Sequence, residues 1–268
     1  MENILTIFLI IIGAISVYYM IFRIILRGRL FGPDYNWCTP AQANAPEFTE
    51  STVPTRDGQM RTIWHAAGNK NKPVVLYLHG NFFSNAAYSF MMKPYTDAGF
   101  SVCMAEYRGF DKTGGHASER GFYLDARAAY DFLIKAGYKK IVIHGNSLGA
   151  SVAAKIASDL EGEGTPPFGV ILEAPFYNLL AMCPKLPLIK LFAGRMFRSD
   201  KYVQNIKSPH VLLMHGAMDK LICPRQGTGL FGKIAAPKKL LKIFTGGAHE
   251  LVDAGSVEYA TTWLKKLK

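Results

Sequence analysis

The sequence predicts an α/β protein with a mostly parallel central sheet and helices on both of its faces. Three observations carry this prediction. Short runs of β-branched and apolar residues alternate with stretches of helical periodicity, which is the pattern of parallel strands joined by crossover helices. The motif Gly145-x-Ser147-x-Gly149 stands between one such run and one such stretch. Finally, 268 residues of which 49% are hydrophobic suffice for a full core and exclude a disordered chain.

The elements are expected in a regular order. A hairpin comes first, from Phe48–Val53 and Met60–Ala66. Buried strands are predicted at 74–79, 100–107, 140–144, 168–172, 209–215 and 239–244, and helices at 118–136, directly after the motif, at 226–234 and at 257–267. Residues 175–207 break this alternation and predict a short helical cap over the carboxyl edge of the sheet. Residues 30–45 have the composition of a linker, so 46–268 is expected to be a single domain.

Residues 1–29 are expected to form a transmembrane anchor. Ile4–Phe22 is 19 residues without a charge, and a helix of that length spans roughly 28 Å, close to a bilayer core of about 30 Å. A cleaved signal peptide is the alternative, but the only charged residue before the run is Glu2. Three basic residues follow the run, Arg23, Arg27 and Arg29, and none precedes it. This asymmetry predicts a single-pass protein with its main domain on the cytoplasmic face.

The chain is basic, with a formal net charge of +11, and much of that charge lies in 175–207 and in the last third. Each basic residue near an anionic bilayer contributes about 1 kcal/mol, so a membrane is an expected partner, and a merely solvated basic surface is the alternative. No nucleic-acid-binding motif accompanies the charge, and no nucleic acid is expected. The four cysteines are scattered along the chain at Cys38, Cys103, Cys183 and Cys223. They form no Cys-x-x-Cys pair and predict neither a disulfide framework nor a zinc site.

Ser147 is the expected nucleophile. The run Ile141–His144, the motif and the small apolar residues that follow predict a strand, a sharp turn and a helix, which is the nucleophile elbow. Gly145 and Gly149 are expected because a side chain at either position would collide with the neighbouring strand or helix.

A serine hydroxyl needs a base, and the base needs an acid that orients it. His249 lies in a glycine-rich loop after the last expected strand and is the expected base, with His210 and His215 as less favoured candidates. Asp219 follows the preceding strand and is the expected acid. Glu173, at the end of the strand before that, is the alternative.

Two backbone N–H groups are expected to form an oxyanion hole. Leu148, directly after the nucleophile, supplies one, and Asn81 in the turn after the strand at 74–79 supplies the other, with Phe82 as the next candidate. No metal-binding, phosphate-loop or dinucleotide pattern is present. Neither a metal nor a cofactor is therefore expected.

With these residues assembled, the chain resembles the α/β-hydrolase superfamily, and more closely the membrane-anchored Bem46-type group with its ABHD13- and ABHD17-like relatives. The matching stretches are Leu78-His-Gly-Asn81, Glu106-Tyr-Arg-Gly109, Glu119-Arg-Gly-Phe-Tyr-Leu-Asp125, Gly145-Asn-Ser-Leu-Gly149, Glu173-Ala-Pro175, His215-Gly-Ala-Met-Asp219 and Gly247-Ala-His249. The resemblance implies the α/β-hydrolase fold and the same three catalytic residues. Glu106 departs from the family, which usually has aspartate there, and Asn146 stands where arginine or histidine is commoner.

The sequence therefore predicts a membrane-anchored serine hydrolase that cleaves carboxylic esters or thioesters through an acyl-enzyme on Ser147. A lipid ester or an acylated protein is the expected substrate. Two alternatives stay open: a serine peptidase of the S33 type, and a non-catalytic membrane scaffold that uses the hydrolase fold.

Overall fold

The computed structural model of the chain describes residues 2–32, 37–182 and 196–267. The chain divides into two units, Met1–Gly32 and Pro33–Lys268. The first unit contains a single long helix, α1, at Glu2–Leu30.

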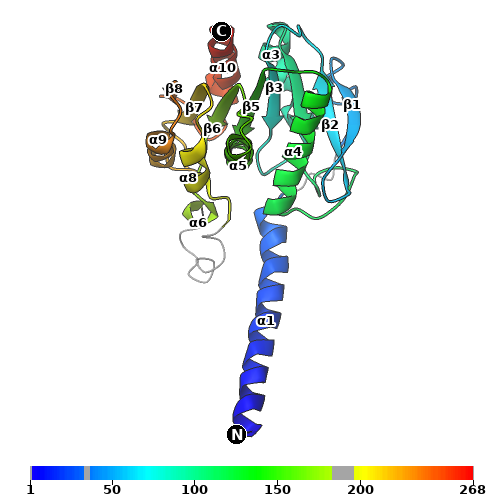
Figure 1. Ribbon diagram of the computed structural model, residues 1–268, viewed down its shortest axis with the longest axis vertical. Coiled ribbons are helices and arrows are strands. Elements are labelled where there is room, and N and C mark those ends of the chain that lie inside the picture. The colour runs from blue at the N-terminus through cyan, green and yellow to red at the C-terminus, as the bar shows by residue number, and fades with distance from the viewer. Residues whose placement is uncertain (1, 33–36, 183–195, 268) are drawn as a thin grey trace. The chain divides into compact units, whose positions relative to one another are not determined.

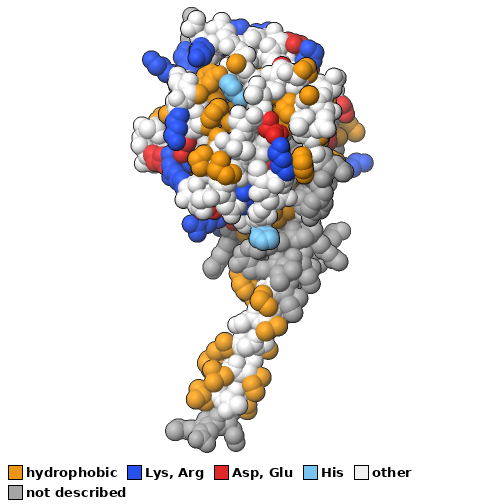
Figure 2. Space-filling model, turned by 90° about the vertical axis from the view of Figure 1, so that its right-hand side faces the viewer, with side chains coloured by type: hydrophobic (Ala, Val, Ile, Leu, Met, Phe, Trp, Pro, Cys, Tyr) orange, Lys and Arg blue, Asp and Glu red, His pale blue; other side chains and the backbone are white. Residues whose placement is uncertain are grey.

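The described side chains of α1 are exposed and mostly apolar, and Figure 2 shows them over the surface of that helix. Among the described residues, no helix is both long enough and apolar enough to cross a bilayer. The transmembrane span at Ile4–Phe22 therefore stays a prediction.

The second unit is built on one sheet, whose described strands follow the order β1-β2-β4-β3-β5-β6-β7-β8 (Figure 1). β2 pairs antiparallel with β1 and β4, and every other neighbouring pair is parallel. The bounds are β1 Thr49–Pro54, β2 Met60–Ala66, β3 Val74–Leu78, β4 Ser101–Ala105, β5 Ile141–Asn146, β6 Gly169–Glu173, β7 His210–Gly216 and β8 Lys239–Phe244. Leu78 lies opposite Gly145, so the turns after β3 and β5 meet at the carboxyl edge.

Helices cover both faces of the sheet, which buries the central strands β3 to β6 on both sides. α3 and α10 share a hydrophobic core with one face, and α4, α5, α8 and α9 adjoin one another on the other. The helices are α2 Asn85–Tyr88, η1 Ser89–Met92, α3 Lys93–Asp97, α4 Glu119–Lys135, α5 Leu148–Gly162, α6 Leu179–Met182, α8 Ser199–Tyr202, η2 Val203–Asn205, α9 Pro224–Lys233, η3 Val252–Ala254 and α10 Ser256–Lys265.

Local sequence explains why α4 begins and ends where it does. The Ser118 side chain accepts a hydrogen bond from the Gly121 N–H at 3.2 Å and caps the first turn. Glu119 lies in the first turn and Lys135 in the last, where each side-chain charge is stabilised by the opposite end charge of the helix dipole. Phe122 and the other apolar residues at helical spacing face the core.

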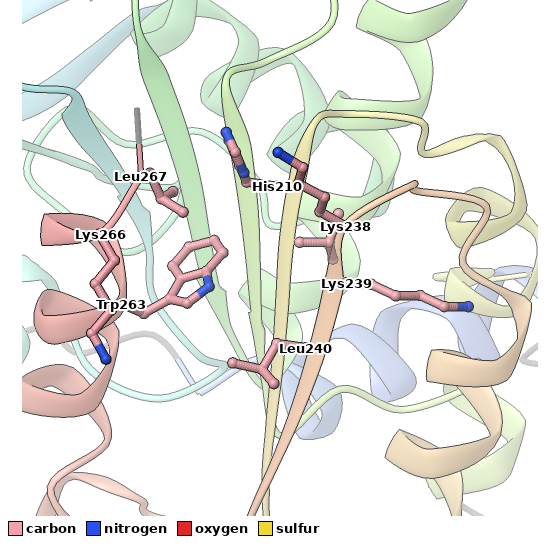
Figure 3. A pocket seen from close by; sticks show the side chains of 8 residues that line it. His210, Lys238, Lys239, Leu240, Trp263, Lys266 and Leu267 are labelled. Atoms are coloured by element: carbon pink, nitrogen blue, oxygen red, sulfur yellow. The ribbon is translucent and has the colours of Figure 1, made fainter.

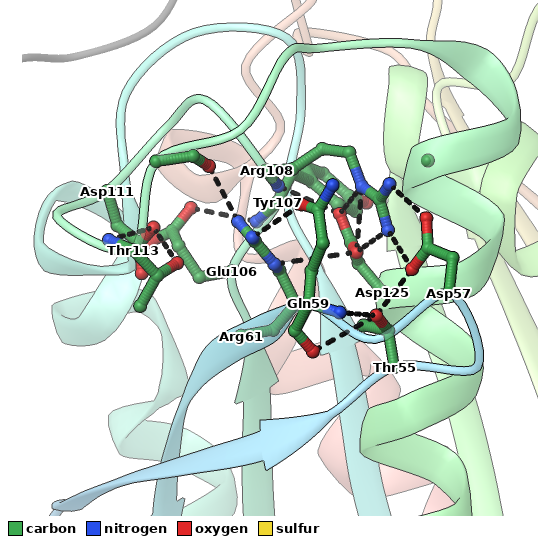
Figure 4. Close-up of polar contacts among 12 residues, drawn as sticks. Thr55, Asp57, Gln59, Arg61, Glu106, Tyr107, Arg108, Asp111, Thr113 and Asp125 are labelled. Carbon is green, nitrogen blue, oxygen red and sulfur yellow. Dashed lines mark hydrogen bonds and ion pairs between the residues drawn. The ribbon is translucent and has the colours of Figure 1, made fainter.

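A buried network of ion pairs holds the chain between β4 and α4 in place (Figure 4). The Arg108 guanidinium donates to both oxygens of Asp125, with the shortest contact at 2.7 Å, and to Asp57 at 2.7 Å. Arg61, 2% exposed, donates to the Gly114 carbonyl at 2.7 Å. Because unpaired charges are very unfavourable inside a protein, these contacts fix the β1–β2 turn against the loop after β4.

The predicted α/β fold with a mostly parallel sheet is confirmed. Each predicted strand is present, with bounds that differ by no more than two residues. The segment between β3 and β4 holds three short helices that the sequence analysis did not predict. In the predicted cap, α6, α8 and η2 lie at either end, and residues 183–195 lie outside the described residues.

Candidate active site

Ser147 sits at the sharp turn between β5 and α5, with φ 52° and ψ −112°. A non-glycine residue in such a conformation carries about 1–3 kcal/mol of strain, which the surroundings must offset. The flanking glycines allow the turn: a Cβ atom on Gly145 would lie 2.1 Å from the Gly149 carbonyl oxygen, and one on Gly149 would lie 2.0 Å from the Leu78 carbonyl oxygen. The Ser147 N–H donates to the Glu173 carbonyl at 2.8 Å, which fixes the turn against β6.

The loops after β7 and β8 bring an acid and an imidazole to the serine. They are joined by a hydrogen bond of 2.9 Å from the Met218 N–H to the Gly247 carbonyl. His249 Nδ1 lies 2.8 Å from Asp219 Oδ2, and His249 Nε2 lies 3.1 Å from Ser147 Oγ. The carboxylate accepts the Nδ1 proton, so Nε2 is left to accept the proton of the serine hydroxyl.

Asp219 is held as a buried carboxylate. Its side chain is fully buried, while His249 is 16% exposed. Burial by itself raises the pKa of Asp219, but hydrogen bonds from His215, His249 and the Ile222 N–H outweigh it and hold that pKa well below its usual range. The side chain therefore carries a negative charge beside the imidazole across the neutral pH range.

The rival candidates have other partners. Glu173 accepts from Ser256 at 2.8 Å and contacts His144 Nε2 at 2.9 Å, so its carboxylate is engaged away from His249. His210 begins β7, at the amino edge of the sheet and opposite to the serine.

His215 contacts the acid itself, which the sequence analysis missed. Its Nε2 lies 3.2 Å from Asp219 Oδ2 and 3.0 Å from the Ile222 carbonyl oxygen. Both of these atoms are acceptors, so Nε2 carries the proton and donates it. The i, i+4 spacing to the acid was the only signal in the sequence, and it does not say which way the ring points.

The turn after β3 lies beside the nucleophile. A Cβ atom on Gly80 would lie 3.6 Å from the Ser147 Cβ atom, so Asn81 follows directly in a loop that borders the serine. Leu148 is the first residue of α5, where the backbone N–H has no intrahelical acceptor. Both residues expected to form the oxyanion hole thus belong to backbone next to Ser147.

A second histidine–carboxylate pair supports this turn, and it explains the glutamate that departs from the family pattern. His79 Nε2 lies 2.8 Å from Glu106 Oε1, and the other oxygen of Glu106 accepts the Asn85 N–H at 2.7 Å. His79 Nδ1 lies 2.8 Å from the Gly80 carbonyl. The hydrogen bonds of His79 to Glu106 and Gly80 fix the loop that carries Asn81.

The described residues contain no group of three or more histidine, cysteine or acidic side chains that is arranged to hold a metal ion. A serine, an imidazole and a buried carboxylate in hydrogen-bonded series can activate a hydroxyl for attack on a carbonyl carbon. The fold and this arrangement define the class of protein: an α/β-hydrolase fold with a serine, an imidazole and a carboxylate in hydrogen-bonded series at the carboxyl edge of its sheet.

The chain belongs to the family described as "Serine aminopeptidase, S33", whose model matches residues 69–210, just over half of the chain. It is similar to lysophosphatidylserine lipase ABHD12 from Bos taurus, with 29% identity over 72% of this chain and 54% of that protein. It is also similar to protein bem46 from Schizosaccharomyces pombe, with 26% identity over 81% of this chain and 76% of that protein. The predicted resemblance to the α/β-hydrolases and the Bem46-type group is confirmed.

Among solved structures, the Pyrococcus furiosus esterase Pf2001 has the same fold, with a TM-score of 0.70 at 22% identity over 89% of this chain and 98% of that one. The chain spans about half the length of the first curated relatives it matches. Because of this partial coverage, the substrates of those relatives support a proposal about this chain and do not establish its substrate.

Proposed function

We propose that this serine hydrolase cleaves carboxylic esters of lipid-like substrates at a membrane, through an acyl-enzyme on Ser147. The hydrogen-bonded series from Ser147 through His249 to Asp219 carries the proposal, because its distances of 3.1 and 2.8 Å suit proton transfer.

In the proposed reaction, Ser147 Oγ attacks the acyl carbon while His249 Nε2 takes the hydroxyl proton. His249 then gives that proton to the departing alcohol, which leaves an acyl-serine. A water molecule then attacks the acyl carbon while His249 Nε2 takes its proton, and the carboxylic acid is released as the imidazolium returns that proton to Ser147 Oγ. Asp219 stabilises the imidazolium that forms in both steps.

The backbone N–H groups of Asn81 and Leu148 are proposed to bind the oxyanion of the tetrahedral intermediate. Each donor in such a hole contributes roughly 3–4 kcal/mol to transition-state stabilisation. The close approach of Gly80 to Ser147 supports this assignment.

Exposed apolar side chains near the site favour a lipid-like substrate. Phe82 and Phe83 are each 55% exposed in the loop after β3, and Met218 and Leu221 are 59% and 54% exposed in the loop that carries the acid. Such side chains suit contact with an acyl chain. Phe176, in contrast, is buried in the core and is not open to a substrate chain. That one relative is named a lysophosphatidylserine lipase agrees with this substrate class.

Membrane attachment through residues 1–29 is part of the proposal, with the catalytic domain on the cytoplasmic face. The uncharged run Ile4–Phe22 supports it. An arginine at the centre of a spanning helix disfavours insertion by about 2.5–3.5 kcal/mol. Ile12→Arg is therefore expected to shift the protein from the carbonate-resistant membrane pellet to the supernatant, and unchanged pelleting would refute the span. Protease protection in sealed vesicles tests the orientation.

A peptidase is the second candidate, because the family description names an aminopeptidase. Binding a substrate amine calls for a free acidic group near the serine. In the predicted cap the one acidic residue is Asp200, and its carboxylate accepts from Arg198 at 2.8 and 2.9 Å. That pairing argues against an amine-binding carboxylate in the cap, whereas exposed Glu250, directly after His249, is another acidic group beside the serine, so the anilide comparison below decides between the two substrates. A thioester of an acylated protein stays within the proposed chemistry, and a non-catalytic scaffold would not need the three hydrogen-bonded side chains.

The test is fluorophosphonate labelling of the full chain, followed by a chain-length series of p-nitrophenyl esters and an aminoacyl nitroanilide. We expect labelling and ester hydrolysis for the wild type and for the surface control Ser51→Ala, and neither for Ser147→Ala. Absence of labelling in folded wild-type protein would favour the scaffold, and preferential cleavage of the anilide would favour the peptidase.

A further inference from the structure

A basic cavity lies at the amino edge of the sheet, at the opposite ends of the strands from Ser147. It has a volume of about 380 Å³ and is lined by the starts of β7 and β8 and by the end of α10. Its lining residues are His210, Val211, Lys238, Lys239, Leu240, Trp263, Lys266 and Leu267 (Figure 3). The proposed hydrolysis uses none of them.

The cavity combines an apolar wall with cationic side chains. Figure 3 shows the Trp263 indole reaching from α10 toward the strands, with Leu240 below it, and Lys238 beside His210. Leu240 is 40% exposed although it is a strand residue, so apolar surface is open to solvent here. Lys266 adds a second ammonium group on the helix side.

The positive charge is not neutralised by the protein within the described part of the chain. None of the residues that line the cavity is acidic, and no described carboxylate forms an ion pair with Lys238 or Lys266. The pKa of His210 is lowered by burial and then by the charges of Lys238 and Lys140. Lys239 differs from the others, because its ammonium donates to the Phe231 and Ile234 carbonyls at the end of α9 and points away.

From this combination we infer a second binding site, for a small organic anion that places a phosphate or carboxylate beside His210 and Lys238 and an apolar body on Trp263, with Lys266 adding positive charge on the helix side of the indole. Charge-assisted hydrogen bonds hold the anionic group, and the indole and Leu240 bury the apolar part. Neither component suffices alone, so a simple anion and a neutral aromatic molecule bind weakly.

Phenyl phosphate is a suitable probe, compared with inorganic phosphate and with phenol by calorimetry on the full chain. We expect phenyl phosphate to bind at least tenfold more tightly than either control. Lys238→Ala/Lys266→Ala should weaken that binding at least tenfold. Lys70→Ala/Lys265→Ala removes the same charge from exposed positions outside the cavity and should change it less than twofold.

His210 supplies a second readout, because an anion beside it raises its pKa by about one unit in an NMR titration. Equal weakening by both double variants would reduce the effect to net charge and overturn the site, as would equal affinity for phosphate or for phenol. Binding to vesicles of phosphatidylcholine with phosphatidic acid, without binding of phenyl phosphate, would assign the charge to a membrane surface and also overturn it. Because Ser147 is remote, ester hydrolysis persists in both double variants whatever the outcome.

Discussion

Asp219→Asn gives the sharpest test of the proposed catalytic series, because the substitution preserves shape and changes only charge and hydrogen-bonding capacity. Oδ1 accepts the Leu221 and Ile222 N–H groups at 2.9 and 2.8 Å, so the carbonyl oxygen of asparagine takes that position. The amide nitrogen then replaces Oδ2, 2.8 Å from His249 Nδ1.

An amide nitrogen donates, so the imidazole must place its proton on Nε2. A protonated Nε2 cannot accept the proton of Ser147. The loss of the correct tautomer in a triad of this kind lowers kcat by about 10⁴, which is about 5.4 kcal/mol at 1.36 kcal/mol for each factor of ten.

The assay is kcat/KM for a p-nitrophenyl ester, with thermal unfolding as the check on folding. Asp253→Asn, an exposed acid on η3, is the matched control and should keep wild-type activity. If folded Asp219→Asn retains more than a tenth of wild-type kcat/KM, Asp219 is not the acid and the reasoning from its hydrogen bonds is refuted.

The same substitution predicts a pH dependence of stability. The fold lowers the pKa of Asp219 below its ordinary value of 3.8, so the folded state favours the ionised form. This stabilisation is complete above the unfolded-state pKa and is lost as the pH falls through the folded-state value. The difference in unfolding free energy between wild type and Asp219→Asn should be largest near pH 7 and should shrink below pH 4. A difference that grows in acid would contradict the assignment of charge.

Three further predictions concern the elbow, the acid's partner and a cysteine. Gly149→Ala places a methyl group 2.0 Å from a backbone oxygen and should lower the unfolding free energy by more than about 3 kcal/mol, whereas Gly162→Ala in the same helix, with open space around it, should be neutral or stabilising in a urea titration. His215→Ala removes a donor to the carboxylate of Asp219, the proposed catalytic acid, which is worth about 1.5–3 kcal/mol, so kcat should fall ten- to a hundredfold, and an unchanged kcat would remove His215 from the site. Burial raises the pKa of the Cys103 thiol to about 12, so native protein at pH 8 should be alkylated by iodoacetamide at exposed Cys223 and not at Cys103, as peptide mass spectrometry can show.

The sequence by itself determined the strands, the long helices and the candidate residues. β-Branched runs and helical periodicity are local signals. Gly145, Ser147 and Gly149 predict the elbow because the sharp turn excludes side chains on both sides of the serine. Chain order and loop position also selected His249 and Asp219, since residues directly after parallel strands meet at one edge of the sheet.

Only the tertiary structure decided how those elements pair and which distant side chains come into contact. The pairing of β2 with β4 and the contact of His215 with Asp219 depend on how distant segments pack, and neither leaves a periodic pattern in the sequence. The same holds for Glu173, a rival acid by position, whose side chain turns to His144 and Ser256. A residue type and its place in the chain restrict the chemistry, whereas the direction of the side chain is set by contacts far away along the chain.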